Sequence, residues 1–247
     1  MAVIAGNWKM NHGPSEALDF LSDFDVDAVP SSHELIVFPS NLSLHAVATA
    51  EQRDSRIQVG VQNVYWENSG AFTGEISAPM AKDAGATFAL VGHSERRHVF
   101  GETDLQTQWK VDIVVSSGLV PVLCVGETLE ERKAGLVEEV ILRQLEVALD
   151  SLCSAPRFLV AYEPVWAIGT GETATPEDAT FAHGTLRRRL ERALSATHAS
   201  RVPILYGGSV KPGNAEELLE ARDVDGLLVG GASLDATSFK QIATAAG

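Results

Sequence analysis

The segment Phe158-Leu-Val-Ala-Tyr-Glu-Pro-Val-Trp-Ala-Ile-Gly-Thr-Gly171 joins an apolar strand to a carboxylate and then to a glycine-flanked apolar loop. Four of the five residues from Phe158 to Tyr162 are apolar, which predicts a strand covered on both faces. Glu163 follows at once, and Pro164 favours an extended backbone at that carboxylate while being unable to donate to a sheet ladder. Apolar residues between a proline and two glycines are typical of a flap that closes over a site. The segment therefore predicts a base at a strand end followed by a lid, which comprises Pro164, Val165, Trp166, Ala167, Ile168, Gly169, Thr170, Gly171, Glu172, Thr173 and Ala174.

Short apolar runs of this kind, rich in β-branched residues, recur along the whole chain of 247 residues. They are continuous rather than alternating, which is typical of parallel strands with both faces buried. The eight runs are Val3–Ala5, Leu35–Phe38, Ile57–Val61, Phe88–Val91, Val120–Val125, Phe158–Tyr162, Val202–Tyr206 and Gly226–Val229.

Helical patterns and helix caps separate the runs. They are a helical stripe over Ser15–Leu21 with Ser15 as its cap, a helix after Thr103-Asp104, a capping box from Thr128 to Glu131 whose helical region extends toward Leu152 with a break near Gly135, a Thr175-Pro176 start, a helix capped by Asn214, and a last helix capped by Asp235 or Thr237. Strands and helices that alternate in this way predict an α/β fold, a closed (β/α)8 barrel of eight parallel strands each followed by a helix. An open doubly wound sheet is the alternative. No linker divides the chain, so we expect one domain over residues 1–247.

The amino-acid composition argues against several classes of protein, including nucleic-acid-binding, membrane-bound and disulfide-rich proteins. A net charge of −14 argues against nonspecific binding to nucleic acid or to an anionic membrane. The two cysteines do not form a disulfide framework, and Cys124 lies inside an apolar run and is expected to be a buried thiol. No membrane-spanning run or secretion signal is present, so we expect a cytoplasmic protein.

Motifs for metals and cofactors are missing or fail. No HExxH, P-loop or Cys/His cluster occurs, so we expect no metal and no cofactor. The run Gly169–Ala174 matches GxGxxA, but an insertion separates it from its strand and Pro176 precedes the helix. A dinucleotide site needs the strand, turn and helix to abut, so we reject it.

Polar residues follow several of the predicted strands, at the rim where barrels of this kind carry their active sites. Asn7 and Lys9 follow the first strand, His93 and Glu95 the fourth, and Glu163 the sixth. Each taken singly is more often structural, for example as half of an ion pair. Taken together on one rim they favour catalysis, because a packed barrel has no structural need for all of them there.

Glycine-rich turns follow the last two strands, at Gly207-Gly208-Ser209 and Gly230-Gly231. Backbone N–H groups in such turns bind phosphate well, and the loops after strands seven and eight are the recurrent phosphate site of this fold. The pattern therefore predicts a small phosphorylated substrate.

Four motifs resemble the triosephosphate isomerase family: Gly6–Asn11, Val91–Arg97, Ala161–Gly171 and Tyr206–Val210. The resemblance extends from residue 3 to the final helix, in order and at family spacing. It implies a TIM barrel and the cofactor-independent interconversion of dihydroxyacetone phosphate and D-glyceraldehyde 3-phosphate in glycolysis and gluconeogenesis.

The resemblance also implies a role for each motif residue. Glu163 would move a proton between carbons 1 and 2, and a neutral His93 would polarise the carbonyl, a pairing for which this family is itself a standard example. Lys9 would neutralise substrate charge, Asn7 would hydrogen-bond near the oxyanion, and Glu95 would orient the Lys9 region. Substrate-binding groups would be Asn7, Lys9, Gly169, Ser209, Gly230 and Gly231. If Ser94–Arg97 opens a helix, its positive end would help to keep His93 neutral.

Two features depart from this picture. Glu172 is acidic where many relatives carry lysine, and the net charge of −14 would repel an anionic substrate. Two other functions remain open: a lyase or aldolase that uses Lys9 as a Schiff base, and a barrel that binds without catalysis. The first requires a deprotonated Lys9, and the position beside Asn7 does not suggest an apolar pocket. The second is disfavoured by intact Lys9, His93 and Glu163.

The segment Gln62–Ser77 is too long for a simple turn and too apolar for disorder, since it carries Tyr65, Trp66, Phe72 and Ile76. It would commonly fold back on its own barrel. The resemblance implies instead that it inserts into a partner subunit of a homodimer, with Thr73 near the partner's catalytic region.

Overall fold

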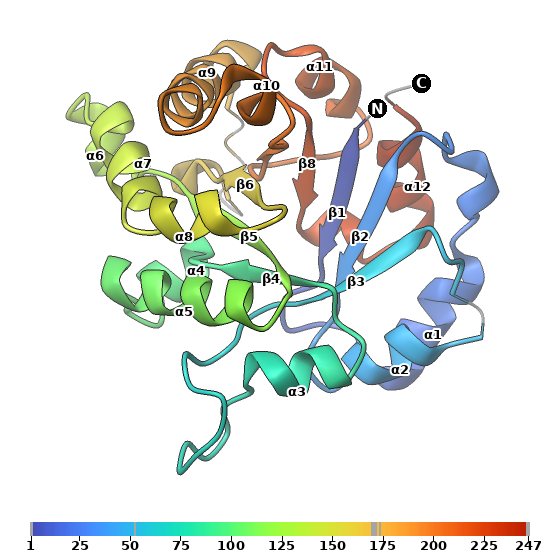
Figure 1. Cartoon of the computed structure of the whole chain (residues 1–247). Helices are drawn as coiled ribbons and strands as arrows, with labels where there is room; N and C mark the ends of the chain where they lie inside the picture. The colour runs from blue at the N-terminus through green and yellow to red at the C-terminus, as the bar shows by residue number, and fades with distance from the viewer. Residues whose placement is uncertain (1, 52, 169–171, 173, 246–247) are drawn as a thin grey trace.

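The computed structural model describes residues 2–51, 53–168, 172 and 174–245, and it contains eight parallel strands closed into a barrel (Figure 1). The strands follow one another around the barrel in sequence order, and Val3 of the first pairs with Gly226 of the last. This closure confirms the (β/α)8 barrel and excludes the open doubly wound sheet. The strands are β1 (Val3–Asn7), β2 (Glu34–Phe38), β3 (Ile57–Val61), β4 (Phe88–Val91), β5 (Val120–Val125), β6 (Leu159–Tyr162), β7 (Ile204–Tyr206) and β8 (Gly226–Val229).

Helices surround the barrel on its outside (Figure 1). The α-helices are α1 (Pro14–Asp23), α2 (Leu44–Thr49), α3 (Ala78–Asp83), α4 (Ser94–His98), α5 (Asp104–Ser116), α6 (Leu129–Lys133), α7 (Val137–Glu146), α8 (Leu149–Ser154), α9 (Pro176–Ala193), α10 (Ala196–Ala199), α11 (Ala215–Glu220) and α12 (Ala236–Thr244). Three short 3-10 helices join them: η1 (Val26–Ala28), η2 (Val165–Ala167) and η3 (Gly231–Ser233).

The predicted helix starts are confirmed where a side chain caps the backbone. Thr103, Thr128 and Thr175 each accept a bond from the N–H three residues on, and Asp235 rather than Thr237 caps α12. Two predicted caps are wrong. Helix α1 begins at Pro14, so Ser15 lies inside its first turn and Gly13 takes the N-cap position, where its N–H donates to Glu16 Oε2. Asn214 precedes α11 but turns its amide to Lys211 and Ser209 instead.

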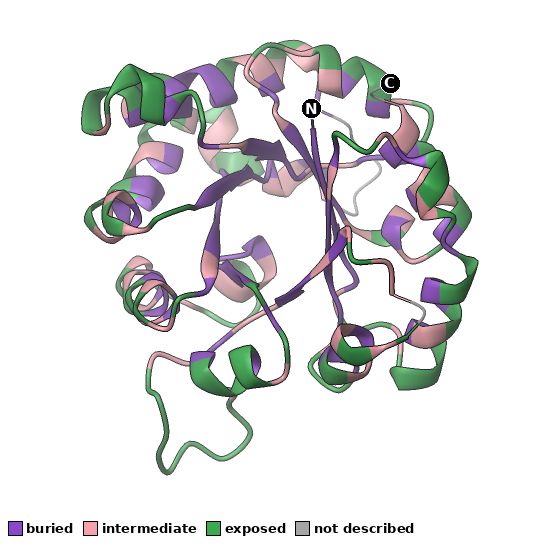
Figure 2. Ribbon diagram, turned by 45° about the vertical axis from the view of Figure 1, so that its right-hand side comes forward, coloured by how far each residue is buried: buried purple, intermediate pink, exposed green. Residues whose placement is uncertain are grey.

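The barrel interior is filled with side chains, so the barrel itself can carry a site only at its ends. The strands are buried along their length, and the helices are buried on the sides that face them (Figure 2). Phe38 and Phe88 lie inside the barrel beside Gly60, where an added Cβ would lie 2.2 Å from the Phe38 ring. The interior is therefore packed to the point that glycine alone fits at this position.

His183 in α9 is fully buried behind the strand that carries the candidate base. Its Nδ1 lies 3.0 Å from the Asp223 carbonyl, and its ring meets the edge of Tyr162. Burial lowers the pKa of His183 to about 4, although the bond to Asp223 opposes the shift. The folded protein therefore keeps this ring neutral well below the pH at which an exposed histidine takes up a proton.

This burial predicts a loss of stability in mild acid. The unfolded chain binds a proton at His183 near its ordinary pKa, so the stability due to the neutral ring is complete above about pH 6.5 and falls as the pH approaches 4. Between pH 7 and pH 5 the loss amounts to about 2 kcal/mol. His183→Gln cannot titrate, so its unfolding free energy in urea should fall less than that of the parent by this amount. Equal losses in the two proteins would contradict the assignment.

Candidate active site

Lys9 follows β1, and its side chain extends across the rim of the barrel. Lys9 has a φ of 53°, a left-handed conformation that is uncommon for a residue with a side chain. Its N–H donates to Asn7 Oδ1 at 3.0 Å, and its carbonyl accepts from Gln62 Nε2 at 2.8 Å. Bonds from the last residue of β1 and from the residue that follows β3 therefore hold the lysine backbone on both sides.

The Lys9 ammonium pairs with Glu95, with 2.7 Å between Nζ and Oε1. An added Cβ on Gly230 would lie 3.6 Å from Lys9 Cε, so the loop after β8 passes directly beside the lysine stem. The predicted neighbours Lys9, Glu95 and Gly230 are therefore brought together.

His93 stands at the N-cap of α4, and its ring is bound from both sides. Nδ1 accepts the Glu95 N–H at 3.2 Å, which places the proton of a neutral ring on Nε2. Nε2 lies 3.2 Å from Asn7 Nδ2 and 3.0 Å from Glu163 Oε1. The expectation that Ser94–Arg97 opens a helix is confirmed.

Glu163 follows β6 directly and is 2 % exposed. Its second carboxylate oxygen, Oε2, accepts the Ser94 N–H at 2.8 Å. Burial raises the pKa of this carboxyl, but the charge and hydrogen bond of His93 and the Ser94 N–H lower it, and the pKa stays below its usual value. The result is a buried, ionised carboxylate.

Two glycines make room for the backbone and side chain of Glu163. An added Cβ on Gly126 would lie 1.7 Å from the Glu163 carbonyl oxygen, and one on Gly207 would lie 2.9 Å from Glu163 Cγ. The turns after β5 and β7 therefore approach β6 more closely than a side chain would allow.

A second buried carboxylate, Glu127, anchors the start of the predicted lid. Its Oε1 accepts from Tyr162 Oη at 3.1 Å and from the Trp166 indole N–H at 2.8 Å. The Arg132 guanidinium lies 4.4 Å above the Trp166 ring. Glu127 comes two residues after the predicted strand Val120–Val125, but it was not among the predicted site residues. The only signal for it was the nearby Trp166, a residue with one polar atom in an apolar loop.

The remaining predicted residues have mixed outcomes. Ser209 follows β7 at the same rim. Gly231 is the first residue of η3, so its N–H has no hydrogen-bond acceptor within that helix. Within the lid, Pro164, Ala167 and Ala174 are buried, Val165, Trp166 and Ile168 are partly buried, and Glu172 is exposed. Gly169, Thr170, Gly171 and Thr173 lie outside the described residues. Cys124 is a buried thiol as predicted.

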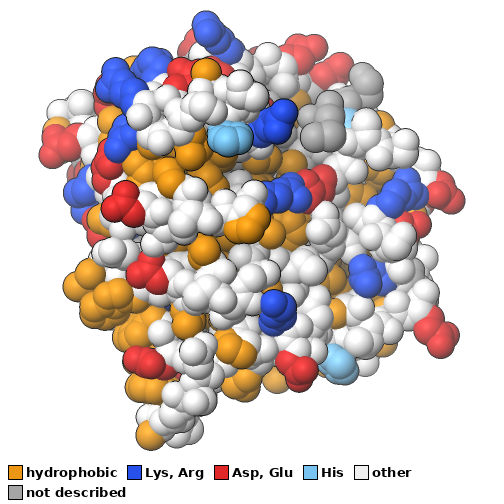
Figure 3. All heavy atoms as spheres, in the orientation of Figure 1, with side chains coloured by type: hydrophobic (Ala, Val, Ile, Leu, Met, Phe, Trp, Pro, Cys, Tyr) orange, Lys and Arg blue, Asp and Glu red, His pale blue; other side chains and the backbone are white. Residues whose placement is uncertain are grey.

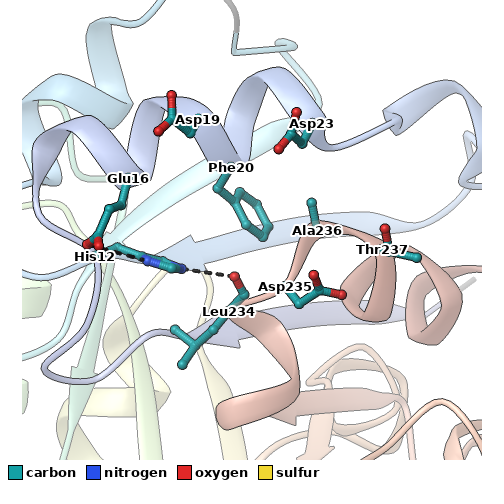
Figure 4. A pocket seen from close by; sticks show the side chains of 9 residues that line it. All are labelled: His12, Glu16, Asp19, Phe20, Asp23, Leu234, Asp235, Ala236 and Thr237. Atoms are coloured by element: carbon teal, nitrogen blue, oxygen red, sulfur yellow. Dashed lines mark hydrogen bonds and ion pairs between the residues drawn. The ribbon is translucent and has the colours of Figure 1, made fainter.

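A cavity of about 510 Å³ lies elsewhere, between α1 and the start of α12 (Figure 4). His12 at its edge bonds to the Leu234 carbonyl, and Glu16, Asp19, Asp23 and Asp235 supply carboxylates around it. These groups would repel an anion, and none of the predicted catalytic residues lies there. The rim of the barrel therefore remains the candidate site.

The described residues hold neither a cluster of metal-ligating side chains nor a membrane-spanning helix. Over these residues no three His, Cys, Asp or Glu side chains come together as ligands for a metal ion. Among the helices of the same part of the chain, none is both long and apolar enough to cross a bilayer.

Comparison with known proteins identifies the family. The family model for triosephosphate isomerase matches residues 2–246. The chain belongs to the triosephosphate isomerase family. A protein named triosephosphate isomerase from Acidithiobacillus ferrooxidans is 48% identical to it over 99% of this chain and 96% of the relative. Proteins of the same name from Syntrophotalea carbinolica and Chlamydia trachomatis are 47% and 46% identical, each over 97% of this chain, and they are covered to 96% and 88%.

For a triosephosphate isomerase family member, the close approach of Gly207 predicts a sensitive position. Gly207→Ala would push its methyl group against Glu163 Cγ, and Glu163 would move because its neighbours are packed. We expect isomerase turnover to fall by on the order of 10²-fold in a folded protein. Gly213→Ala is the matched control, since an added Cβ there meets nothing within 4 Å. Equal turnover in the two variants would show that the contact does not position Glu163.

Proposed function

We propose that the protein interconverts dihydroxyacetone phosphate and D-glyceraldehyde 3-phosphate through an enediolate, without a cofactor. The observation that carries the proposal is the contact of 3.0 Å between His93 Nε2 and the buried Glu163 carboxylate, on the rim that also holds Lys9. A proton beside a carbonyl is weakly acidic, so its removal needs an aimed base together with groups that stabilise the enediolate. The rim supplies both.

Glu163 would act as the base. In the free protein its carboxylate is held by the Ser94 N–H and faces His93, and both contacts lower its pKa. To reach a substrate proton the carboxylate would leave these partners, while its burial would persist. Burial raises the pKa of a carboxyl, so the group would become more basic as it moves toward the substrate.

His93 would polarise the substrate carbonyl as a neutral donor through Nε2–H. Burial lowers the pKa of His93, but the Glu163 carboxylate raises it, and the net shift in the free protein is upward. When Glu163 turns to the substrate, that raising influence weakens. The Glu95 N–H on Nδ1 and the charge of Lys9 both oppose a second ring proton, so the neutral form would be favoured at that stage.

Asn7 and Lys9 would complete the binding of the oxyanion. Asn7 Oδ1 is occupied by the Lys9 N–H, so its Nδ2 must face the His93 ring. Asn7 Nδ2 and His93 Nε2 are then two neighbouring donors to one substrate oxygen. Lys9 would add positive charge, with Glu95 orienting it. Its pairing with Glu95 at 2.7 Å also disfavours the Schiff-base alternative, which requires a neutral amine.

Backbone N–H groups of Ser209, Gly230 and Gly231, together with Gly169, would hold the phosphate. Gly230 lies against Lys9, so a phosphate there would leave the carbon atoms of a three-carbon substrate within reach of the lysine. The lid from Pro164 to Ala174 would close over the enediolate and exclude water. The triose phosphates are glycolytic intermediates, so we place the enzyme in the cytoplasm.

The substitution Glu163→Asp tests the role of the base separately from the binding of the substrate. The change retracts the carboxylate by about one methylene, and a displacement near 1 Å costs on the order of 10²-fold. Turnover should fall by at least this much, while KM should change little because the phosphate is held elsewhere. Glu138→Asp, the same change at an exposed carboxylate on α7, should leave both constants near those of the parent. The assay couples glyceraldehyde 3-phosphate consumption to a reporter enzyme, and a Glu163→Asp variant within a few-fold of parental turnover would remove Glu163 from this role.

We also propose a homodimer in which the loop Gln62–Ser77 of each chain inserts into its partner. The loop projects from the barrel between β3 and α3, and its tip is exposed (Figures 1 and 2). At its base the Tyr65 N–H donates to the Ile76 carbonyl at 2.8 Å, and Tyr65 lies against the rings of Trp66 and Phe72. The loop is therefore shaped by its own contacts while its tip points away from its own barrel.

Apolar surface accompanies the loop. Met10, Leu42, Val99 and Phe100 follow three different strands at the active-site rim and are between 63% and 96% exposed. Hydrophobic side chains also gather next to the projecting loop at the lower left of Figure 3. Exposed apolar surface on this scale is typical of an interface, and a closed two-fold dimer would bury it.

The dimer can be tested with Thr73→Arg combined with Phe72→Asp. We expect this variant to sediment as a monomer and to lose most of its turnover, because the loop would no longer support the partner's Lys9 and His93 region. Phe181→Asp, a polar change at a 51% exposed side chain on α9, should remain a dimer. A monomer with parental turnover would refute the link to catalysis, and a monomeric parent at micromolar concentration would refute the dimer.

A further inference from the structure

Arg97 in α4 is a buried cation that lies beside the turn Gly92–His93, which carries the candidate electrophile. Its side chain is 7% exposed. Its Nε donates to the Gly92 carbonyl at 2.7 Å, and its Nη2 approaches the Cys124 carbonyl at 3.4 Å. Its Nη1 donates to Asp104 Oδ1 at 2.6 Å. One planar guanidinium thus connects the ends of β4 and β5 to the start of α5.

The turn at Gly92 is built around this side chain. Gly92 has a φ of 71°, and an added Cβ would lie 2.7 Å from Arg97 Nη2 and 3.0 Å from Thr107 Cγ2. A residue with a side chain would meet both backbone strain and a clash there. The Gly92 carbonyl belongs to the peptide bond between Gly92 and His93. By binding this carbonyl, Arg97 fixes the orientation of that peptide group and therefore the direction of the His93 side chain.

The ion pair with Asp104 does not account for the whole arrangement. Asp104 also accepts from Arg143, at 2.5 Å from its other oxygen, so it retains a cation if Arg97 is removed. Among the side chains of the described residues, by contrast, Arg97 alone donates to the Gly92 carbonyl. The second carbonyl that Arg97 approaches is that of Cys124. The thiol of the same cysteine lies beside the Glu163 carboxylate.

We propose that Arg97 is a positioning residue that fixes His93 through the Gly92 carbonyl and fixes the β5 end beside Glu163 through the Cys124 carbonyl. It touches neither the substrate nor the reacting atoms. The proposal rests on the proposed function, since it assigns Arg97 to the electrophile and base of that reaction. The fork shape of the guanidinium matters because two carbonyls and a carboxylate are bound at fixed angles.

Three variants test the proposal, each checked by circular dichroism and thermal unfolding. Arg97→Met keeps the apolar stem but loses every bond, and we expect its kcat to fall by on the order of 10²-fold with KM within about threefold of the parent. Arg97→Lys keeps the charge but can bind only part of the set, so we expect an intermediate loss of about tenfold. Arg143→Met removes the outer partner of Asp104 and leaves Gly92 untouched, so its kcat should stay within about twofold of the parent.

A spectroscopic measurement separates positioning from a general loss of structure. With ¹⁵N-labelled histidine, the parent should show His93 with its proton on Nε2 and an accepting Nδ1. In Arg97→Met we expect the Nδ1 and Nε2 resonances of His93 to shift, while those of buried His183 stay in place. The same shift is expected in Arg97→Lys at smaller size, so this variant decides the question if Arg97→Met does not fold.

Two results would overturn the proposal. Equal kcat values in Arg97→Met and Arg143→Met would mean that the Gly92 bond has no part in turnover. Full kcat in Arg97→Lys would mean that charge alone suffices and that the two-carbonyl fork does not position His93. A parental turnover in His93→Gln would instead contradict the proposed function, and this variant is measured alongside so that the two failures are distinguishable.

Discussion

The ionised carboxylate of Glu163, buried at the end of β6, is the constraint on which the rest of the rim depends. A buried charge is stable only where hydrogen-bond donors or opposite charges surround it. Here one oxygen takes the Ser94 N–H and the other faces the His93 ring at 3.0 Å. Both groups lie at the start of α4, where free N–H groups favour negative charge. The position of α4 and the ionisation of Glu163 therefore depend on each other.

Close approach of the backbone is the second part of the same constraint. Gly126 and Gly207 flank Glu163 from the neighbouring strands, and side chains at either position would occupy its space. On the far side of β6, His183 packs against Tyr162, which in turn donates to Glu127. Glu163 thus lies between two close glycine turns, and the residue before it packs against a neutral ring.

The sequence predicted the barrel because its strands are continuous apolar runs, and burial decides their position more strongly than local propensity. The short helices α2, α3 and α10 were not predicted, since each has six residues or fewer and too little periodicity to stand out. At the rim, the residue types and their strand-end positions were enough to select Asn7, Lys9, His93, Glu95 and Glu163. Their contacts confirm that they lie together; their roles stay predictions.

What the sequence could not predict depends on contacts between distant segments. Arg97 carries no signal that separates it from Arg96, yet Arg97 points inward to two carbonyls while Arg96 bonds to Glu102 and lies over the Phe100 ring. The two predicted caps at Ser15 and Asn214 failed for a local reason instead. Glu16 binds the Gly13 N–H and the helix begins before Ser15, while the Asn214 amide accepts from the Lys211 N–H and donates to the Ser209 carbonyl beside the predicted phosphate loop.

The charges of the rim bear on how an acidic protein can bind an anion. The chain carries a net charge of −14, and within the site Lys9 is already paired with Glu95 while Glu163 is ionised. Side-chain charge alone would therefore leave little attraction for a phosphate. Backbone N–H groups avoid this difficulty, because their partial positive charges attract a phosphate whatever the net charge of the side chains. A site made of them also needs no charged side chain to lose its water. The proposed phosphate site at the glycine turns after β7 and β8 would thus leave Lys9 available for the reacting end of the substrate.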